Sequence, residues 1–420
     1  MVATQQSEEV HDEMTAAATP IQSFDKLVRR QWLVRRHIEH LKSGTTDSDP
    51  EGARFVPSSE YLDPEILKAE RAFLRTVPLV AAHSSQLPEP HAYRCEDILD
   101  VPLLLIRDAE GQARAYLNSC SHRGARLLEG EGKIDGRIRC SYHAWSYSSN
   151  GELLSITQEK KFGNINCGGL SLVELPCAER YGLIFVTLTP EQVMDIDAFL
   201  GDFAPHLEMA NLTSFTIHEC RQMTHSASWK LALCGYLESY HVRVVHAESI
   251  GGAFVGNLST HDAYGPEKQH LLTTWPMMDI AEIAKQDDVD AAIRRHPYSP
   301  HNTVLYLWPC TIITAPDFIG ISHLIRVTPG QNPGEQLTEF RILLPKEIKP
   351  EEKQTIEEFD ELTVRALEEE DYGQLRGIQK ALNSGLRKGM LIGANEPSLT
   401  SMHRSIARAA GRGLPDLPAQ

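Results

Sequence analysis

Two short segments decide the fold of this chain: Cys120-Ser-His122-Arg-Gly and Cys140-Ser-Tyr-His143-Ala-Trp. Each segment supplies one cysteine and one histidine, and seventeen residues separate His122 from Cys140. One Cys and one His from each of two facing loops provide two thiolates for one iron and two imidazoles for a second iron. Common structural zinc sites instead pair the cysteines in one arm and the histidines in the other. The spacing therefore favours a mixed-ligand [2Fe-2S] cluster, with zinc as the alternative.

The residues around the two segments suit this cluster. Glycines there supply turns that let backbone amides approach the sulfurs, and hydrogen bonds to sulfur raise the reduction potential. The glycines are Gly124, Gly130, Gly132, Gly136 and Gly151. Trp145 and Tyr147 are expected to pack beneath the loops without a chemical role.

The composition indicates a globular chain without a nucleic-acid or membrane partner. A length of 420 residues exceeds what one hydrophobic core usually serves, so we expect two domains or one domain with a large insertion. The formal net charge of −16 argues against binding to a phosphate backbone, which needs clustered Lys and Arg. The strongest apolar run, Val101–Ile106, is far shorter than the roughly 20 residues that cross a bilayer. Residues 1–20 lack the features of a secretory signal, so we expect a disordered tail and a cytoplasmic protein.

Eight cysteines in a chain of this length are too sparse for a disulfide framework. Two belong to the cluster segments, and Cys234 lies in the motif described below. The other five are expected to be inert buried thiols: Cys95, Cys167, Cys177, Cys220 and Cys310.

The start of the chain, residues 21–78, is predicted to be helical. Apolar residues at helical spacing predict an amphipathic helix over Ile21–Leu41, and the polar stretch Gly44–Ser59 predicts a linker. Asp63 followed by Pro64 predicts the N-cap and first residue of a second helix.

The rest of the chain divides into a β-rich part, residues 79–190, and a mixed part, residues 191–420. Short β-rich runs between Gly, Asn and Asp turns predict a small all-β unit with strands Pro102–Ile106, Ala113–Leu117, Leu170–Leu175 and Leu183–Leu188. The mixed part has predicted helices Glu191–Met209, Ser228–Val245, Met278–Gln286 and Lys349–Leu382, and predicted strands Ser214–Thr224, Val304–Thr314, Gly320–Thr328 and Glu335–Leu344. The fold class is therefore α+β.

A third motif lies in the mixed part, where Glu238-Ser-Tyr-His241 is followed by His246. A cluster of this kind moves only single electrons, so the rest of the chain is expected to hold the group that uses them. Glu238 and His241 share a helical face, whereas His241 and His246 lie about 140° apart on an ideal helix. Both imidazoles reach one metal only if the helix ends, kinks or bulges between them. Two surface histidines on an amphipathic helix are the alternative.

The order CxHRG, CxYHAW, then Trp-Lys and ExYHx4H resembles the catalytic subunits of Rieske ring-hydroxylating oxygenases and related demethylases, over almost the whole chain. This resemblance implies an all-β Rieske [2Fe-2S] domain over residues 79–190. It would be inserted into a helix-grip (START/SRPBCC-like) catalytic domain with an antiparallel sheet, formed by residues 21–78 and 191–420. The resemblance also implies that His241 and His246 bind a mononuclear iron(II).

The third iron ligand is implied by a late acidic segment. In the family, the ligand aspartate precedes a glutamine by eight residues, and this frame selects Asp371, eight residues before Gln379, with Glu370 as the alternative. Two imidazoles and one carboxylate on one face of iron leave positions open for O2.

Glu238 is implied to connect two subunits. By resemblance, its carboxylate hydrogen-bonds an iron histidine and a cluster histidine, matched by His143, of a neighbouring chain, which fixes the imidazole tautomers. A homotrimer is therefore expected, and the presence of a small β subunit stays open. Because no GxGxxG followed by a βαβ pattern occurs, electrons from NAD(P)H are expected through a separate reductase, with or without a ferredoxin.

The resemblance implies O2-dependent mono- or dihydroxylation of an aromatic or other apolar cyclic substrate. Oxidative N- or O-demethylation and pure electron transfer are the alternatives. The expected walls of an apolar pocket are Phe254, Trp275, Met277, Met278, Trp308 and Phe318. Cys234 and Gly235 depart from the polar residues frequent in the family and predict a less polar pocket floor, and Ser228 replaces a common Asn before Trp-Lys.

Overall fold

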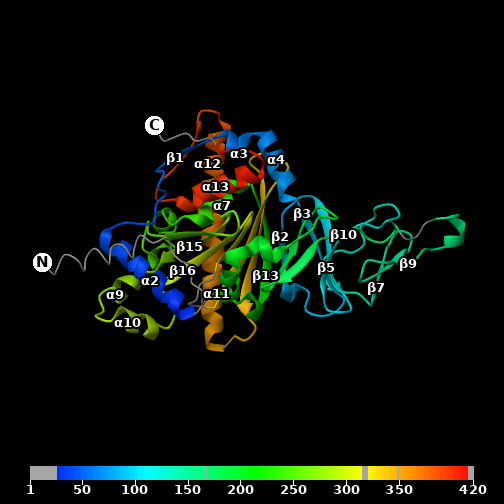
Figure 1. Ribbon diagram of the computed structural model, residues 1–420, viewed down its shortest axis with the longest axis horizontal. Helices are drawn as coiled ribbons and strands as arrows, with labels where there is room; N and C mark the ends of the chain where they lie inside the picture. The colour runs from blue at the N-terminus through cyan, green and yellow to red at the C-terminus, as the bar shows by residue number, and fades with distance from the viewer. Residues whose placement is uncertain (1–25, 166–168, 315–319, 349, 415–420) are drawn as a thin grey trace.

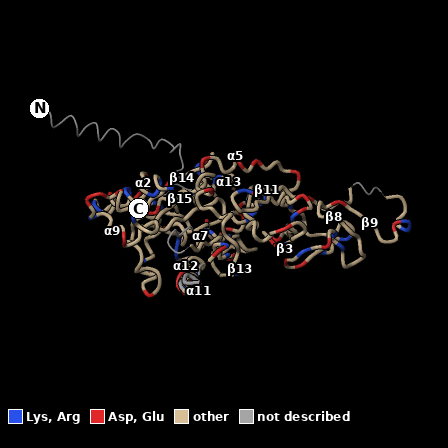
Figure 2. The backbone as a smooth tube through the Cα atoms, turned by 90° about the horizontal axis from the view of Figure 1, so that it is seen from below, with Lys and Arg blue, Asp and Glu red and all other residues tan. Residues whose placement is uncertain are grey.

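The computed structural model describes residues 26–165, 169–314, 320–348 and 350–414. The molecule is elongated, and the two views in Figures 1 and 2 agree on which elements lie at its ends. Strand β9 (Leu153–Ser155) lies toward one end, and helix α9 (Ile280–Ile283) lies at the other. The predicted tail 1–20, Cys167 and Phe318 fall outside the described residues.

The β-rich part is built from three small antiparallel sheets. A five-stranded sheet has the order β10-β5-β4-β3-β6, and two three-stranded sheets have the orders β11-β12-β2 and β7-β8-β9. Besides β9, these sheets contain β2 (Leu79–His83), β3 (Ala92–Ile98), β4 (Val101–Arg107), β5 (Ala113–Leu117), β6 (Glu131–Lys133), β7 (Arg137–Arg139), β8 (Ser146–Ser148), β10 (Glu174–Leu175), β11 (Cys177–Arg180) and β12 (Leu183–Val186). The predicted strand Leu170–Leu175 is wrong except for its last two residues, because Leu170–Val173 run without a ladder partner of their own.

The second part centres on a seven-stranded antiparallel sheet of order β13-β19-β18-β17-β16-β15-β14. The strands are β13 (Phe215–His225), β14 (Thr260–Tyr264), β15 (His270–Pro276), β16 (His301–Leu307), β17 (Thr311–Thr314), β18 (Ser322–Pro329) and β19 (Gln336–Pro345). The single predicted strand Val304–Thr314 is wrong, because the chain turns at residues 308–310 and forms the β16-β17 hairpin. Strands β14 and β15 were not predicted.

Alternation along the sheet strands separates its two faces. On one face Leu272, Leu305 and Leu324 pack in a core shared with β12 and helices α5 (Ile196–Leu200) and α6 (Ala204–Ala210). On the other face Val304, Ile325 and Phe340 join the main core beneath helix α7. This second face lines the candidate site.

Helices cover the large sheet, and the inserted β-rich part projects away from them at one end of the molecule (Figure 1). They include α2 (Lys26–Ser43), α3 (Ser59–Leu62), α4 (Pro64–Leu74), α7 (Trp229–Leu237), α8 (Val242–Val245), α10 (Val289–Arg295), α11 (Pro350–Arg365), α12 (Tyr372–Asn383) and α13 (Pro397–Ala409). The predicted cap of α4 is confirmed, since the Asp63 carboxylate accepts a hydrogen bond from the Glu65 amide at 2.8 Å and Pro64 opens the helix. The helices predicted over 191–209 and 278–286 are shorter than expected.

The β-rich part is an insertion, because segments before and after it in sequence pair with each other. Strand β1 (Arg54–Pro57) lies in the predicted linker and pairs antiparallel with β20 (Gly389–Ile392) near the end of the chain. Helix α4 packs on α13. The expected α+β class, with an all-β domain inserted into a helix-and-antiparallel-sheet domain, is therefore confirmed. No helix in the described part combines the length and apolar character needed to cross a bilayer.

Candidate functional site

Two histidines and one aspartate meet at the edge of the main sheet domain. Oδ1 of Asp371 lies 3.5 Å from Nε2 of His241 and 3.2 Å from Nε2 of His246. One ligand atom from each of the three side chains lies within 4.8 Å of the others. Two neutral imidazoles and one carboxylate at this separation can hold a divalent metal such as Fe(II).

The outer nitrogens of both imidazoles are held by carboxylates. Nδ1 of His241 contacts Oε1 of Glu238, and Nδ1 of His246 lies 2.6 Å from Oε2 of Glu370, which also accepts from the Ser249 hydroxyl at 2.6 Å. Burial lowers the pKa of His246, but its carboxylate neighbours outweigh burial and raise the pKa above its ordinary value. A carboxylate accepts at each Nδ1, so in the neutral ring Nδ1 carries the proton and Nε2 faces Asp371.

The backbone breaks before the first of the two histidines. Helix α7 ends at Leu237, and Glu238 takes an extended conformation with φ −136° and ψ 154°. The short helix α8 then places His241 at its start and His246 at its end, with the two ring centroids 5.3 Å apart. The predicted continuous helix over 228–245 is therefore wrong, and the helical turn that joins the two histidines ends at Val245, just before His246. Glu238 and His241 meet through this turn and not through a shared helical face.

Asp371 is positioned by a second irregularity, in the long late helix. The last turn before α12, Ala366–Asp371, is π-helical and joins α11 to α12. Such π-turns occur often at functional sites. Glu370, the predicted alternative ligand, turns to Nδ1 of His246 instead of joining the ligand cluster.

Buried polar contacts fix α7 to its surroundings. Oε1 of Gln379 accepts from the Ser228 amide at 2.9 Å, which ties α12 to the first turn of α7. Lys230 is 1% exposed and contacts Glu60 and Glu70, and Nε1 of Trp229 donates to Glu70 at 2.9 Å. The Trp-Lys pair and the glutamine of the late frame thus fix α7, which precedes the two histidines, and α12, which follows Asp371.

A cavity of about 460 Å³ opens beside His241, His246 and Asp371, between the sheet face and helices α7 and α11. Phe254, Trp275 and Met277 line it as expected. Met278 is largely exposed, and Trp308 instead stacks on Phe73 in the core, with ring centroids 5.7 Å apart, so these two predicted walls are wrong. Walls missed from the sequence are Tyr236, Phe340, Phe359, Leu362 and Leu367.

Cys234 does not form the floor of this cavity. It lines a separate hollow of about 630 Å³ on the other side of α7, together with Glu238, His241, Arg387 and Leu391. Burial raises the pKa of the Cys234 thiol, which packs near His403. Gly235 lines both spaces, so only this part of the expected low-polarity floor lies at the cavity.

The four residues of the cluster segments also come together, on the loops after β5 and β7. Cys120 and Cys140 are buried and interact with each other, and the rings of His122 and His143 lie 4.6 Å apart between centroids. Nδ1 of His122 is buried and has no hydrogen-bond partner among the residues described. Two thiols and two imidazoles, one with an unpaired buried nitrogen, fit the donor set of a [2Fe-2S] cluster.

Tyr147 has a polar contact that sequence reasoning missed. Its hydroxyl lies 3.1 Å from Sγ of Cys120 and accepts from the Ser121 amide at 3.1 Å. Trp145 stacks on His122 with an interplanar angle of 6° and is packing, as expected. No sequence signal separates Tyr147 from Trp145, because both are buried aromatics of the same segment.

One of the glycines near the cluster segments is required by the structure. At Gly151, with φ +76°, an added Cβ would lie 2.5 Å from the Tyr116 ring, so a larger residue would clash there.

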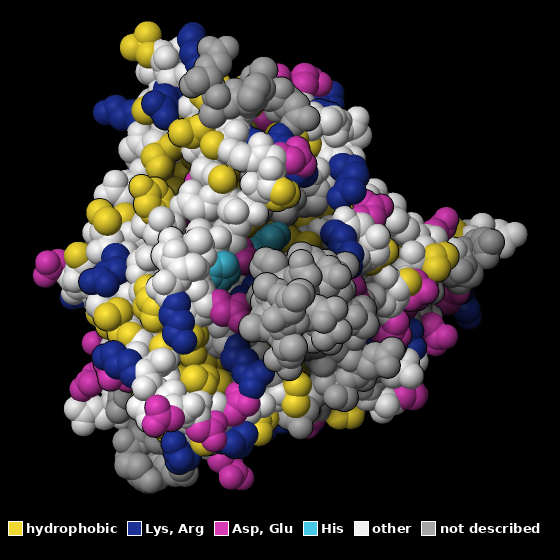
Figure 3. All heavy atoms as spheres, turned by 60° about the vertical axis from the view of Figure 1, so that its left-hand side comes forward, with side chains coloured by type: hydrophobic (Ala, Val, Ile, Leu, Met, Phe, Trp, Pro, Cys, Tyr) yellow, Lys and Arg dark blue, Asp and Glu magenta, His cyan; other side chains and the backbone are white. Residues whose placement is uncertain are grey.

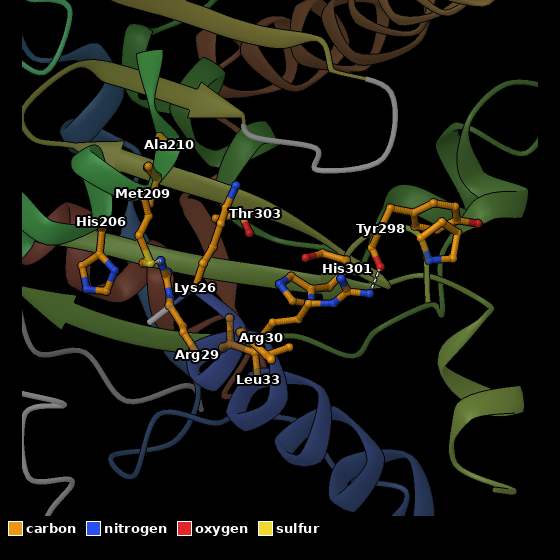
Figure 4. A pocket seen from close by; sticks show the side chains of 14 residues that line it. Lys26, Arg29, Arg30, Leu33, His206, Met209, Ala210, Tyr298, His301 and Thr303 are labelled. Atoms are coloured by element: carbon orange, nitrogen blue, oxygen red, sulfur yellow. Dashed lines mark hydrogen bonds between the residues drawn. The ribbon is translucent and has the colours of Figure 1, made fainter. Parts of the chain in front are cut away.

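A second, more basic cavity lies away from the metal cluster. It has about 360 Å³ between α2, α6 and β16, and Figure 4 shows Lys26, Arg29 and Arg30 of α2 on its lining, with Arg29 pointing toward Met209 of α6. Arg30 donates to the carbonyl of His296 at 2.9 Å, which fixes the loop before β16. The cavity shares no lining residue with the site at Asp371.

The surface carries no single-sign face in the view of Figure 3. Basic, acidic and hydrophobic side chains are interspersed there, and histidine side chains are visible near the middle of the face beside acidic ones.

Four described cysteines outside the motifs behave as inert thiols, since burial raises the pKa of Cys95 and Cys220 to about 11 and that of Cys177 and Cys310 to about 12.

Comparison with known proteins gives two domain families in sequence order. Residues 77–176 match the Rieske [2Fe-2S] domain, and residues 211–411 match the ring hydroxylating alpha subunit (catalytic domain). The carnitine monooxygenase oxygenase subunit of Escherichia coli (strain K12) is 26% identical over 367 residues, which cover 85% of this chain and 92% of that protein.

Solved structures show the same fold. A quaternary ammonium Rieske monooxygenase in complex with L-carnitine superposes with a TM-score of 0.73 at 21% identity, covering 86% of this chain and 97% of that one. Naphthalene 1,2-dioxygenase from Rhodococcus sp. superposes with a TM-score of 0.67 at 17% identity, covering 90% and 97%.

Proposed function

We propose, since this chain belongs to the Rieske non-haem iron oxygenases as a homologue of their catalytic alpha subunits, that it is the terminal oxygenase of a system that hydroxylates an apolar cyclic substrate. The proposed iron ligands are His241, His246 and Asp371, and the proposed cluster ligands are Cys120, His122, Cys140 and His143. The observation that carries the proposal is the convergence of two imidazoles and one carboxylate at the mouth of an apolar cavity. When bound, the cluster supplies single electrons and the mononuclear iron supplies O2 activation.

The protein's own residues prepare the site. Glu238 and Glu370 hold a proton at Nδ1 of each histidine, so that Nε2 of each offers a lone pair toward Asp371. The aromatic and aliphatic walls exclude water from the space next to the ligands. A substrate bound there is held close to the metal with its apolar body desolvated.

Electrons are proposed to enter from a neighbouring chain. In both Figures 1 and 2 the sheet β7-β8-β9, which flanks the Cys140–His143 loop, lies far along the molecule from α7 and α12. Tyr142 next to His143 is 59% exposed, and the hollow at Glu238 is rimmed by Leu391, which is 58% exposed. These surfaces suit docking of one chain's cluster loop at the Glu238 of another, as in a homotrimer.

The remaining partners follow from this scheme. A separate reductase, with or without a ferredoxin, is proposed to deliver electrons from NAD(P)H to the cluster. Glu238 at the bridging position favours an oxygenase without a small β subunit. Oxidative N- or O-demethylation is the second candidate reaction, favoured by the similarity to an oxygenase subunit named for carnitine.

Metal content tests the assignment of the groups. The purified protein is expected to contain about three irons and two acid-labile sulfides per chain, from one two-iron cluster and one further iron. Zinc without sulfide would overturn the proposal.

A mixing experiment tests the route between subunits. Cys140→Ser removes a proposed cluster ligand, and Asp371→Ala removes a proposed iron ligand, so each variant alone is expected to be inactive. Co-expressed mixed oligomers are expected to regain O2 consumption, because an intact cluster in one chain can serve an intact iron site in another. Mixed oligomers as inactive as either variant would contradict electron transfer between chains.

A further inference from the structure

The cavity beside His241, His246 and Asp371 carries almost no charge. Among the described lining residues there is no Lys, Arg or Glu, and the one acidic side chain is Asp371, which faces the histidines. A charged substrate would lose its hydration there without an ionic partner, which is strongly unfavourable. The cavity therefore favours an uncharged substrate.

One polar side chain in the sheet wall stands out. His323 on β18 is 3% exposed, and its Nδ1 lies 2.9 Å from Oγ1 of Thr314, its neighbour across the β17-β18 ladder. Thr314 Oγ1 also accepts from the backbone N–H of His323 at 3.2 Å. Because Oγ1 of the half-buried Thr314 already accepts from the backbone N–H, we assign its hydroxyl as the donor to Nδ1, which places the proton of the neutral ring on Nε2.

That Nε2–H group is left without a hydrogen-bond partner in the described part of the chain. Burial lowers the pKa of His323 to about 4, so the ring is neutral at physiological pH. Phe340 lies against the ring with centroids 4.9 Å apart and holds its orientation. A fixed, buried and unpaired donor is costly unless a ligand supplies the acceptor.

A second unpaired donor lies in the same wall. Nε1 of Trp275 on β15 is buried and has no partner among the described residues, and Trp275 pairs in register with Asn302 on β16. Asn302 lines the cavity with an amide that can both donate and accept. The sheet side of the cavity thus offers hydrogen-bond donors, whereas the helix side offers Phe359, Leu362 and Leu367.

We infer that the substrate is an uncharged molecule with an apolar cyclic body and a carbonyl or ether oxygen, and that His323 recognises this oxygen. The inference rests on the proposed function for the identity of the cavity and adds the class of substrate. Thr314 is a positioning residue, because it acts only through the His323 tautomer. The zwitterion L-carnitine would bring charges without a partner in the cavity, and a plain hydrocarbon would leave the His323 N–H without an acceptor.

The test is calorimetric titration of the purified, cluster-containing protein with four probes: 1-indanone, indane, indane-1-carboxylate and L-carnitine. The wild type is expected to bind 1-indanone about tenfold more tightly than indane, the contribution of a buried hydrogen bond, and to bind both charged probes more weakly still. His323→Leu is expected to bind the ketone and the hydrocarbon equally while keeping its affinity for indane. Ile325→Leu, on the same strand and also in the cavity, is the matched control and should keep the ketone preference.

Each other outcome counts against the inference. Tightest binding of either charged probe would overturn the neutral substrate. Equal binding of ketone and hydrocarbon by the wild type, no binding of any probe, or an unchanged ketone preference in His323→Leu would overturn recognition by His323. Iron and sulfide are measured separately on the same samples, so absence of the metals overturns the proposed function without altering the binding result.

Discussion

The carboxylate of Glu370 lies 2.6 Å from Nδ1 of His246, while the carboxylate of the next residue, Asp371, lies 3.2 Å from Nε2 of the same ring. Two adjacent acidic residues therefore reach opposite sides of one imidazole. The π-turn that ends at Asp371 makes this possible, because it changes the direction of successive side chains. One carboxylate orients the ring, and the other faces the proposed metal position.

This division of roles predicts different losses of iron. Asp371→Ala is expected to lose the mononuclear iron, from about three irons per chain to about two, and to keep the visible spectrum of the cluster. Glu370→Gln is expected to keep the iron but to bind it about 10–100-fold more weakly, because a neutral amide oxygen replaces the charged acceptor at Nδ1 of His246. Competition with a chelator, followed by iron analysis, measures both. Equal iron loss in the two variants would show that the roles are not divided.

The Tyr147 hydroxyl at the Cys120 sulfur predicts an effect on the reduction potential of the cluster. Tyr147→Phe removes this hydrogen bond and should lower the potential by on the order of 40 mV, the one-electron equivalent of a bond of ~1 kcal/mol. Redox titration followed by visible spectroscopy measures the shift. Trp145→Phe, which keeps a ring over His122 and removes no sulfur contact, is the control. A potential unchanged in Tyr147→Phe would mean that the hydroxyl does not act on the cluster.

The buried Lys230 predicts a large stability effect far from the chemistry. Lys230→Met leaves Glu60 and Glu70 with Arg412 as their remaining cationic partner, and loss of the buried ammonium is expected to cost up to about 3 kcal/mol of stability. Lys68→Met, which breaks an exposed pair with Glu65, should change stability by less than about 1 kcal/mol. Thermal unfolding of the two variants compares them. Similar midpoints would argue against a structural role for the Trp-Lys pair.

Buried neutral histidines predict loss of stability in mild acid. Burial is the largest cause that lowers the pKa of His270 and of His83 to about 4. In His270, Nε2 donates to the Phe199 carbonyl at 3.0 Å and Nδ1 accepts from the Trp308 amide at 3.2 Å, so the folded ring has no place for a second proton. The unfolded ring titrates near 6.5 and binds more protons between these values, so stability is present above about pH 6.5 and is lost as pH falls toward 4.

The expected slope is up to about 1.4 kcal/mol per pH unit for each such histidine. The thermal midpoint should therefore be lower at pH 5 than at pH 7.5. His270→Gln, whose amide can donate and accept in the same place, should flatten this dependence. A midpoint that is equal at both pH values, or a slope unaltered in the variant, would refute the assignment.

Spacing indicated the four cluster residues and the family resemblance selected His241, His246 and Asp371, but neither showed how the backbone brings them together. Cys120, His122, Cys140 and His143 stand in short segments whose residue types already indicate their chemistry. Helix geometry indicated that one regular helix could not carry both His241 and His246 to one metal. It did not indicate where the helix breaks, at Glu238 before both histidines.

Other features had no local signal. The π-turn at Asp371 and the contact of Glu370 with His246 arise from packing of α12 against α7, through Gln379 and Ser228. The β16-β17 hairpin was read as one strand because apolar residues continue through its turn. Trp308 was read as a pocket wall for the same reason, since residue type does not tell which side of a turn a side chain will occupy.

The two sides of the cavity differ in which substitutions they can accept. The helical side is one continuous segment made of α11, the π-turn and α12. Phe359, Leu362 and Leu367 shape the cavity from the same continuous backbone that ends in Asp371. Substitutions that enlarge this side to admit bulkier compounds will also shift the carboxylate, so new substrate range and loss of metal arrive together. Ile325 and Phe340 belong to a separate layer, the sheet, and carry no proposed ligand. Directed evolution of this enzyme should therefore find its tolerated changes on the strands.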